Sequence, residues 1–138
     1  MLGNSKNKNI VHFVQNTLGC QCDKEVFNSI ESGRGSTPNG EAAFAKIVIG
    51  NRLLIYIVKP LSEAESLINN LIPILTEMGI LERDSKGYNR FRLVLAKQSD
   101  DVISDTLIKD FQKTAGHDEK AHIHFVSQQE LPNVPEIA

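Results

Sequence analysis

The sequence has little of what marks several large classes of protein. Its 138 residues include two cysteines and no tryptophan, and the formal net charge is only −2. Without an excess of basic residues there is no bulk attraction to nucleic acid or to an anionic membrane. No apolar run reaches the roughly 18 residues that span a bilayer, and the polar leader 1–9 lacks a signal-peptide core. We therefore expect a cytoplasmic protein with no membrane or nucleic-acid partner.

The two cysteines, Cys20 and Cys22, are one residue apart. A cytoplasmic location argues against a permanent structural disulfide, and a bridge between them would close a small, strained ring. The pair can instead supply metal ligands, form a redox dithiol, or pack as two small apolar residues. The sequence leaves these alternatives open.

Helical patterns flank the cysteine pair. Apolar residues recur at helical spacing over 10–18, and Gly19 predicts the end of that helix. Asp23 is a typical N-cap for a second helix, expected over 24–31. Cys22 would then precede a helix N-terminus, where the partial positive charge favours a thiolate, although neighbouring acidic residues oppose it.

The remaining sequence predicts a single α/β domain over residues 1–138. Residues 32–41 combine glycine, proline and small polar residues, which predicts a flexible loop. The tail 127–138 is expected to be irregular. Strands are expected at 44–49, 52–59, 91–96 and 121–126, and helices are expected to begin at Ser62 and near Asp100 and to end before Gly79 and Gly116.

The order of these elements predicts their arrangement. Gly50-Asn51 between two apolar runs predicts a hairpin. Residues 53–58 are apolar at every position, which is typical of a central strand with helices on both faces. We expect two N-terminal helices, then a β-hairpin followed by β-α-β-α-β, with the last three strands mutually parallel in a small mixed sheet flanked by helices.

Two histidines in the last expected strand add a second set of candidate ligands. His122 and His124 alternate with apolar residues, so both side chains should lie on one face. Together with Cys20 and Cys22 they are four ligands of the kinds that zinc prefers. We therefore predict a small cytosolic metal-binding domain that holds zinc or iron, with the site completed within the chain or across a homodimer.

Two other interpretations use the same cysteines. In a thiol-disulfide redox protein, Cys22 would attack and Cys20 would resolve the mixed disulfide. In a non-catalytic interaction protein the cysteines would only pack, and the function would lie in a homodimer or protein-partner surface. Whether the protein is an enzyme stays open. No nucleotide cofactor is indicated, because the loop 32–41 lacks the Gly-Lys-Ser/Thr ending of a phosphate-binding loop.

A basic cluster with interleaved aromatic residues precedes and enters the third strand. Cations beside aromatic rings can bind single-stranded nucleic acid. At this net charge we interpret the cluster as a solvated loop that runs into a strand, with Arg90 and Arg92 on its wet face, and we predict no nucleic-acid-binding residues. The cluster contains Arg83, Lys86, Tyr88, Arg90, Phe91 and Arg92.

The segment Leu18-Gly19-Cys20-Gln21-Cys22, followed by Glu25-Val26-Phe27, resembles the opening of a group of small uncharacterised prokaryotic proteins with an LGCxC…EVF motif. The resemblance covers about the first quarter of the chain. Members of that group carry a proline after the second cysteine, where this chain has Asp23. The resemblance implies no activity.

Overall fold

A five-stranded sheet is the centre of the fold. The computed structural model describes residues 9–19, 27–38, 43–58, 71–97 and 105–132. Residues 9–12 are α-helical and continue into a π-helical turn, η1. The elements are η1 (Phe13–Thr17), β1 (Ile30–Ser36), β2 (Ala43–Ile49), β3 (Leu53–Val58), α3 (Leu71–Lys86), β4 (Arg90–Lys97), α4 (Asp105–Ala115), β5 (Ala121–Ser127) and η3 (Gln128–Glu130).

The strands lie in the order β1-β2-β3-β4-β5. β2 is antiparallel to both β1 and β3, whereas β3, β4 and β5 are mutually parallel. Gly50, Asn51 and Arg52 join β2 to β3, and the first two have positive φ, as tight hairpin turns require. The α/β class, the hairpin and the parallel β-α-β-α-β order are therefore confirmed.

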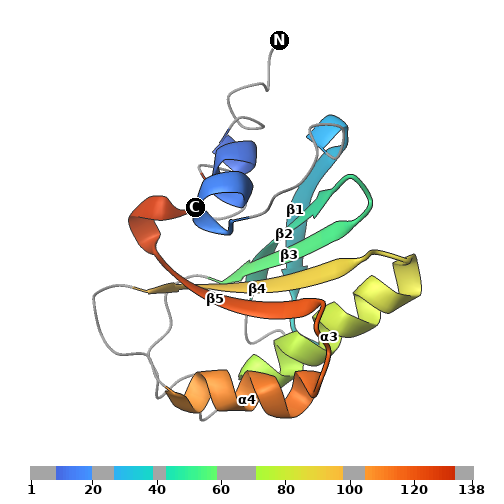
Figure 1. The fold of residues 1–138 in the computed structure, drawn as a ribbon, viewed down its shortest axis with the longest axis vertical. Coiled ribbons are helices and arrows are strands. Elements are labelled where there is room, and N and C mark those ends of the chain that lie inside the picture. The colour runs from blue at the N-terminus through green and yellow to red at the C-terminus, as the bar shows by residue number, and fades with distance from the viewer. Residues whose placement is uncertain (1–8, 20–26, 39–42, 59–70, 98–104, 133–138) are drawn as a thin grey trace.

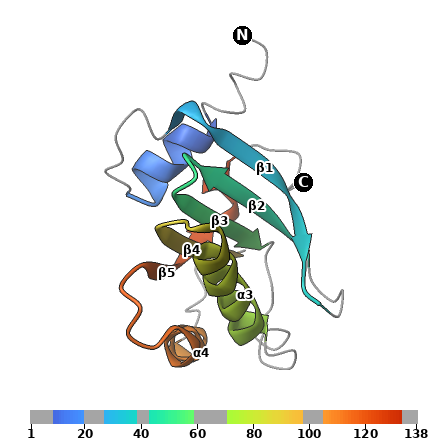
Figure 2. The same ribbon diagram turned by 90° about the vertical axis from the view of Figure 1, so that its right-hand side faces the viewer.

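Helical segments cover both faces of the sheet. α3 and α4 pack on one face, and the segment 9–17 packs on the other (Figures 1 and 2). Every residue of β3 is buried, because alternate side chains enter the two cores. We call the side with α3 and α4 the first face and the side with η1 the second face. The prediction of a central strand covered on both sides is confirmed.

The second N-terminal helix and the loop after it were wrong predictions where the structure describes them. Residues 27–28 form a short 3₁₀ turn, and Ile30 begins β1, which pairs with β2 from Ile30↔Ile49 to Ser36↔Ala43. Residues 32–36, expected in a loop, are thus strand. Gly35 explains part of this, because a β-carbon there would lie 2.5 Å from the ring of Phe44. Glycine lets that ring close over the strand.

The long helix also ends later than expected. Gly79, expected just beyond its C-terminus, lies inside α3 and is buried against Phe91. The helix continues to Lys86, and Gly87 at φ +76° follows it as the left-handed terminating residue. Residues 82–86 are therefore helix, including Arg83 and Lys86, which were expected in a solvated loop. The expected helix start at Ser62 lies outside the described residues.

β5 and the end of α4 match the prediction closely, the tail matches it less, and the expected helix start near Asp100 lies outside the described residues. Gly116, at φ +63°, directly follows α4, as expected. The first three residues of the predicted irregular tail after Ser127 form the 3₁₀ helix η3 instead. Among the helices that the structure describes, none is long and apolar enough to cross a membrane.

Candidate functional site

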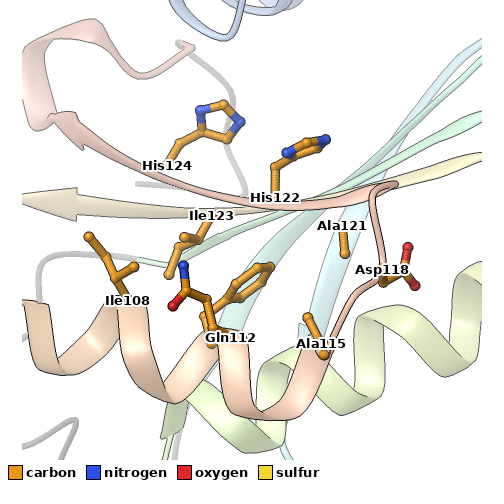
Figure 3. A pocket seen from close by; sticks show the side chains of 10 residues that line it. Ile108, Gln112, Ala115, Asp118, Ala121, His122, Ile123 and His124 are labelled. Carbon is orange, nitrogen blue, oxygen red and sulfur yellow. The ribbon is translucent and has the colours of Figure 1, made fainter.

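The histidine pair lies on the edge strand β5. The rings of His122 and His124 point to the second face, while Ile123 points to the opposite side toward α4 (Figure 3). Both histidines are partly buried. The prediction that they share one face is confirmed. Cys20 and Cys22, the other two predicted ligands, lie outside the described residues.

Arg92 connects the histidine pair to the N-terminal segment. It lies on β4, opposite His122 in the strand register. Its Nη1 donates to the carbonyl oxygen of Leu18 at 3.3 Å and lies 2.9 Å from Nε2 of His124. One nitrogen therefore bridges the imidazole of His124 and the main chain two residues before Cys20.

The environment of the histidines keeps them neutral. Burial, followed by the charge of Arg92 and by His122, lowers the pKa of His124 to about 4. Burial and the charges of Arg92 and Arg90 also lower the pKa of His122, partly opposed by the backbone of Glu119 and by Asp118. At neutral pH both rings are uncharged, which is the form of histidine that binds metal ions.

Arg92 is less exposed than the sequence pattern predicted. Its side chain is partly buried, and its Nε is fully buried with no hydrogen-bond partner. Burial and the nearby charge of Arg90 lower the pKa of Arg92. Among the described residues, no carboxylate forms an ion pair with it. The wet-face interpretation holds for Arg90, which is exposed, and is wrong for Arg92 because Leu18 lies against its guanidinium.

On the first face, a tyrosine and a lysine share one carboxylate. The hydroxyl of Tyr56 donates to Oε1 of Glu82, and Lys46 Nζ lies 2.7 Å from Oε2. Burial alone would raise the pKa of Glu82, but the hydrogen bonds from Lys46 and Tyr56 bring it below its usual value. Burial, and then Glu82, raise the pKa of Tyr56. Each group has a partner, so the arrangement is that of a structural network.

A second ion pair joins α3 to the turn before β5. Arg83 is 8% exposed and makes two hydrogen bonds to Asp118, from Nη1 at 2.9 Å and from Nη2 at 2.6 Å. Asp84 accepts from the same guanidinium. Arg83 and Lys86 belong to α3, so the solvated-loop interpretation is wrong for them. Arg83 therefore has a structural role.

A cavity of about 390 Å³ lies between α4 and β5 (Figure 3). Its apolar lining residues include Ile108, Phe111 and Ile123, and its polar lining residues are Gln112, Asp118, His122 and His124. Asp118 is already bound to Arg83, and the rings of His122 and His124 point away from the cavity. No set of convergent catalytic groups faces it among the residues that the structure describes.

The remaining histidines lie elsewhere. His12 is exposed and contacts Asn16 one turn later, and His117 is exposed just after α4. Within the described parts of the chain, no group of three or more His, Cys, Asp or Glu residues could hold a metal ion. Any further protein ligand for a metal at the histidine pair would have to come from outside those parts.

Comparison with known proteins adds no assignment. No family model matches the chain, and no curated protein or solved structure matches it.

Proposed function

We propose that the protein is a small metal-binding domain that holds zinc or iron with Cys20, Cys22, His122 and His124. The carrying observation is the bridge made by Arg92 Nη1 between the carbonyl of Leu18 and Nε2 of His124. Successive α-carbons are about 3.8 Å apart, so Cys20 is separated from Leu18 by less than about 8 Å of chain. This length of chain would allow the Cys20 thiol to approach the histidine pair.

The chemistry of the four residues supports the same proposal. Two thiolates and two neutral imidazoles form a ligand set that zinc accepts in tetrahedral sites. Histidines two residues apart on one strand face can reach one ion. The chain has two cysteines in all, and both are next to the segment that Arg92 ties to His124.

Arg92 must give way when the metal binds. Because Arg92 Nη1 donates to His124 Nε2, that nitrogen carries its lone pair toward the arginine. Ligation through Nε2 replaces this contact, and ligation through Nδ1 moves the proton to Nε2 and abolishes it. Arg92 also places a positive charge beside the ion. Arg92→Gln should therefore raise metal affinity, whereas a purely structural arginine would lower it.

Metal analysis of protein purified without an affinity tag tests the proposal. We expect about one equivalent of zinc or iron in the wild type, lost in Cys20→Ala/Cys22→Ala and in His122→Ala/His124→Ala. His117→Ala is the matched control, because that histidine is exposed just after α4 and is not one of the proposed ligands. Less than about a tenth of an equivalent in the wild type, with unfolding unchanged by a chelator, would remove the proposal.

Thiol alkylation against pH separates this function from the two others that use the same cysteines. Metal-bound thiolates react slowly until a chelator is added. A redox dithiol reacts fast without chelator, titrates below the ordinary thiol pKa of about 8.5, and forms an intramolecular disulfide under mild oxidant. Cysteines that only pack titrate at or above that value and form no disulfide.

A further inference from the structure

The guanidinium of Arg92 has partners on one side and, among the described residues, none on the other. Nη1 contacts Leu18 and His124, whereas Nε is buried without a partner, and Nη2 makes no hydrogen bond to another described residue. The Nε–Nη2 edge is the side of arginine that binds two oxygens of a carboxylate or phosphate in parallel.

A second positive charge, that of Arg90, lies on the same face of the sheet as Arg92. Arg90 is two residues earlier on β4 and therefore projects to the same face. His122 lies opposite Arg92 on β5. The contrast with Arg83 is direct, because that guanidinium meets two carboxylates, whereas Arg92 has none among the described residues.

We propose that Arg92 and Arg90 form a binding site for the phosphate group of a small molecule. Phosphate fits better than a single carboxylate, because a carboxylate would be satisfied by the Arg92 edge alone, whereas phosphate has further oxygens for Arg90. A small molecule fits better than a nucleic-acid strand, because two arginines and a net charge of −2 give no extended basic track. The site goes beyond the metal proposal and does not depend on it.

Titration with inorganic phosphate against a chloride control of equal ionic strength, followed by amide NMR, tests the site in the full-length protein. We expect saturable shifts of residues 90–92 and 122–124. Arg92→Gln should weaken binding at least about tenfold, since a bidentate charge-assisted contact is lost. Arg92→Lys should weaken it less, because it keeps the charge without the planar fork. Arg34→Gln, on the exposed face of the far edge strand β1, should leave it unchanged.

A second measurement keeps the test valid if Arg92→Gln folds poorly. Phosphate should raise the midpoint of thermal unfolding of the wild type above that in matched chloride, because a ligand of the native state stabilises it. No saturable shifts and no such rise in the wild type would overturn the proposal. So would binding of single-stranded oligonucleotide without binding of phosphate.

The cysteines provide the decisive comparison with the metal site. Phosphate binding of equal strength in the wild type and in Cys20→Ala/Cys22→Ala supports a phosphate site that stands whether or not metal is bound. Binding that appears only after the cysteines are removed would overturn it, because a thiolate would then be the partner of the Arg92 edge. If Cys20→Ala/Cys22→Ala loses the metal but still binds phosphate, the experiment supports both proposals and shows that the two sites are independent.

Discussion

Charged side chains on the two faces of the sheet differ in whether they have partners. On the first face, Arg83 meets Asp118 and Asp84, and Glu82 receives both Lys46 and Tyr56. On the second face, Arg92 has a buried Nε without a partner and lies against an imidazole.

We infer from this difference that the charged residues of the first face are structural and that those of the second face bind a ligand. Buried polar groups are nearly always satisfied, so a closed network such as that of Arg83 needs no ligand to explain it. On the second face, the buried Nε of Arg92 has no acceptor and lies beside a histidine of lowered pKa. Such unsatisfied and perturbed groups are typical of ligand-binding sites. The first face should therefore govern stability, and the second face should govern ligand binding.

The largest expected effect is on the first face. Arg83→Gln removes the guanidinium and leaves Asp118 partly buried without its main partner. Breaking a buried pair from one side is strongly destabilising, so we expect a loss of about 3 kcal/mol in the free energy of unfolding, measured with denaturant. Lys113→Gln, at an exposed position on α4, is the control and should change little. A loss below about 1 kcal/mol would mean that solvent screens the pair.

The next effect concerns packing on the same face. Alanine normally stabilises a helix relative to glycine, but a β-carbon at Gly79 would lie 2.1 Å from the ring of Phe91. We expect Gly79→Ala to destabilise by about 2 kcal/mol through overpacking. Gly33→Ala is the matched control, because nothing lies within 4 Å of a β-carbon there. A stabilised Gly79→Ala protein would show that α3 can move away from the sheet at no cost.

Gly79 also shows why part of the fold could not be predicted. A glycine after an apolar stripe indicates a helix end, and only the position of Phe91 on β4 reveals that it makes room for a ring inside α3. Gly35 is the same case, since its partner Phe44 is on another strand. The hairpin and the parallel strands were predictable because their signals are local: turn residues and unbroken apolar runs.

The candidate site divides in the same way. The alternation around His122 and His124 is a local pattern and gave their shared face correctly. Arg92 lies in a strand with similar alternation, and its burial depends on Leu18, which is 74 residues earlier. The pairing of Arg83 with Asp118 likewise spans 35 residues. Contacts between residues so far apart in the sequence cannot be predicted from the pattern of either segment alone.

The two faces should also respond to different ranges of pH. A histidine whose folded pKa is lowered contributes stability at neutral pH that is lost as the pH falls below the unfolded value of 6.5, because the unfolded state then binds more protons. For His124 this loss extends down to about pH 4. Asp118, whose pKa is lowered by Arg83, contributes stability that is lost only below its unfolded value of 3.8.

His124→Gln tests this division. Between pH 6.5 and 4 the variant should lose less stability than the wild type, by on the order of 1 to 2 kcal/mol after allowing for solvent screening. Below pH 4 the two proteins should lose stability in parallel. Denaturant unfolding of the metal-free proteins at a series of pH values measures both ranges. Identical curves above pH 4 would mean that His124 is protonated as easily in the folded protein as in the unfolded chain.

The smallest expected effect on stability is that of Arg92→Gln, and it is the sharpest test of the comparison. The substitution removes the hydrogen bond to Leu18 and the contact with His124, but it also removes a buried donor that has no partner. These contributions oppose each other, and no described carboxylate is left behind, so we expect a change below about 1 kcal/mol. Denaturant unfolding beside Arg83→Gln, in metal-free protein and in chloride buffer, measures it. Losses of equal size in the two variants would mean that Arg92 is as structural as Arg83, and the assignment of binding to the second face would fail. A small loss of stability together with weaker phosphate binding would instead give the two arginines different roles: Arg83 in stability and Arg92 in binding.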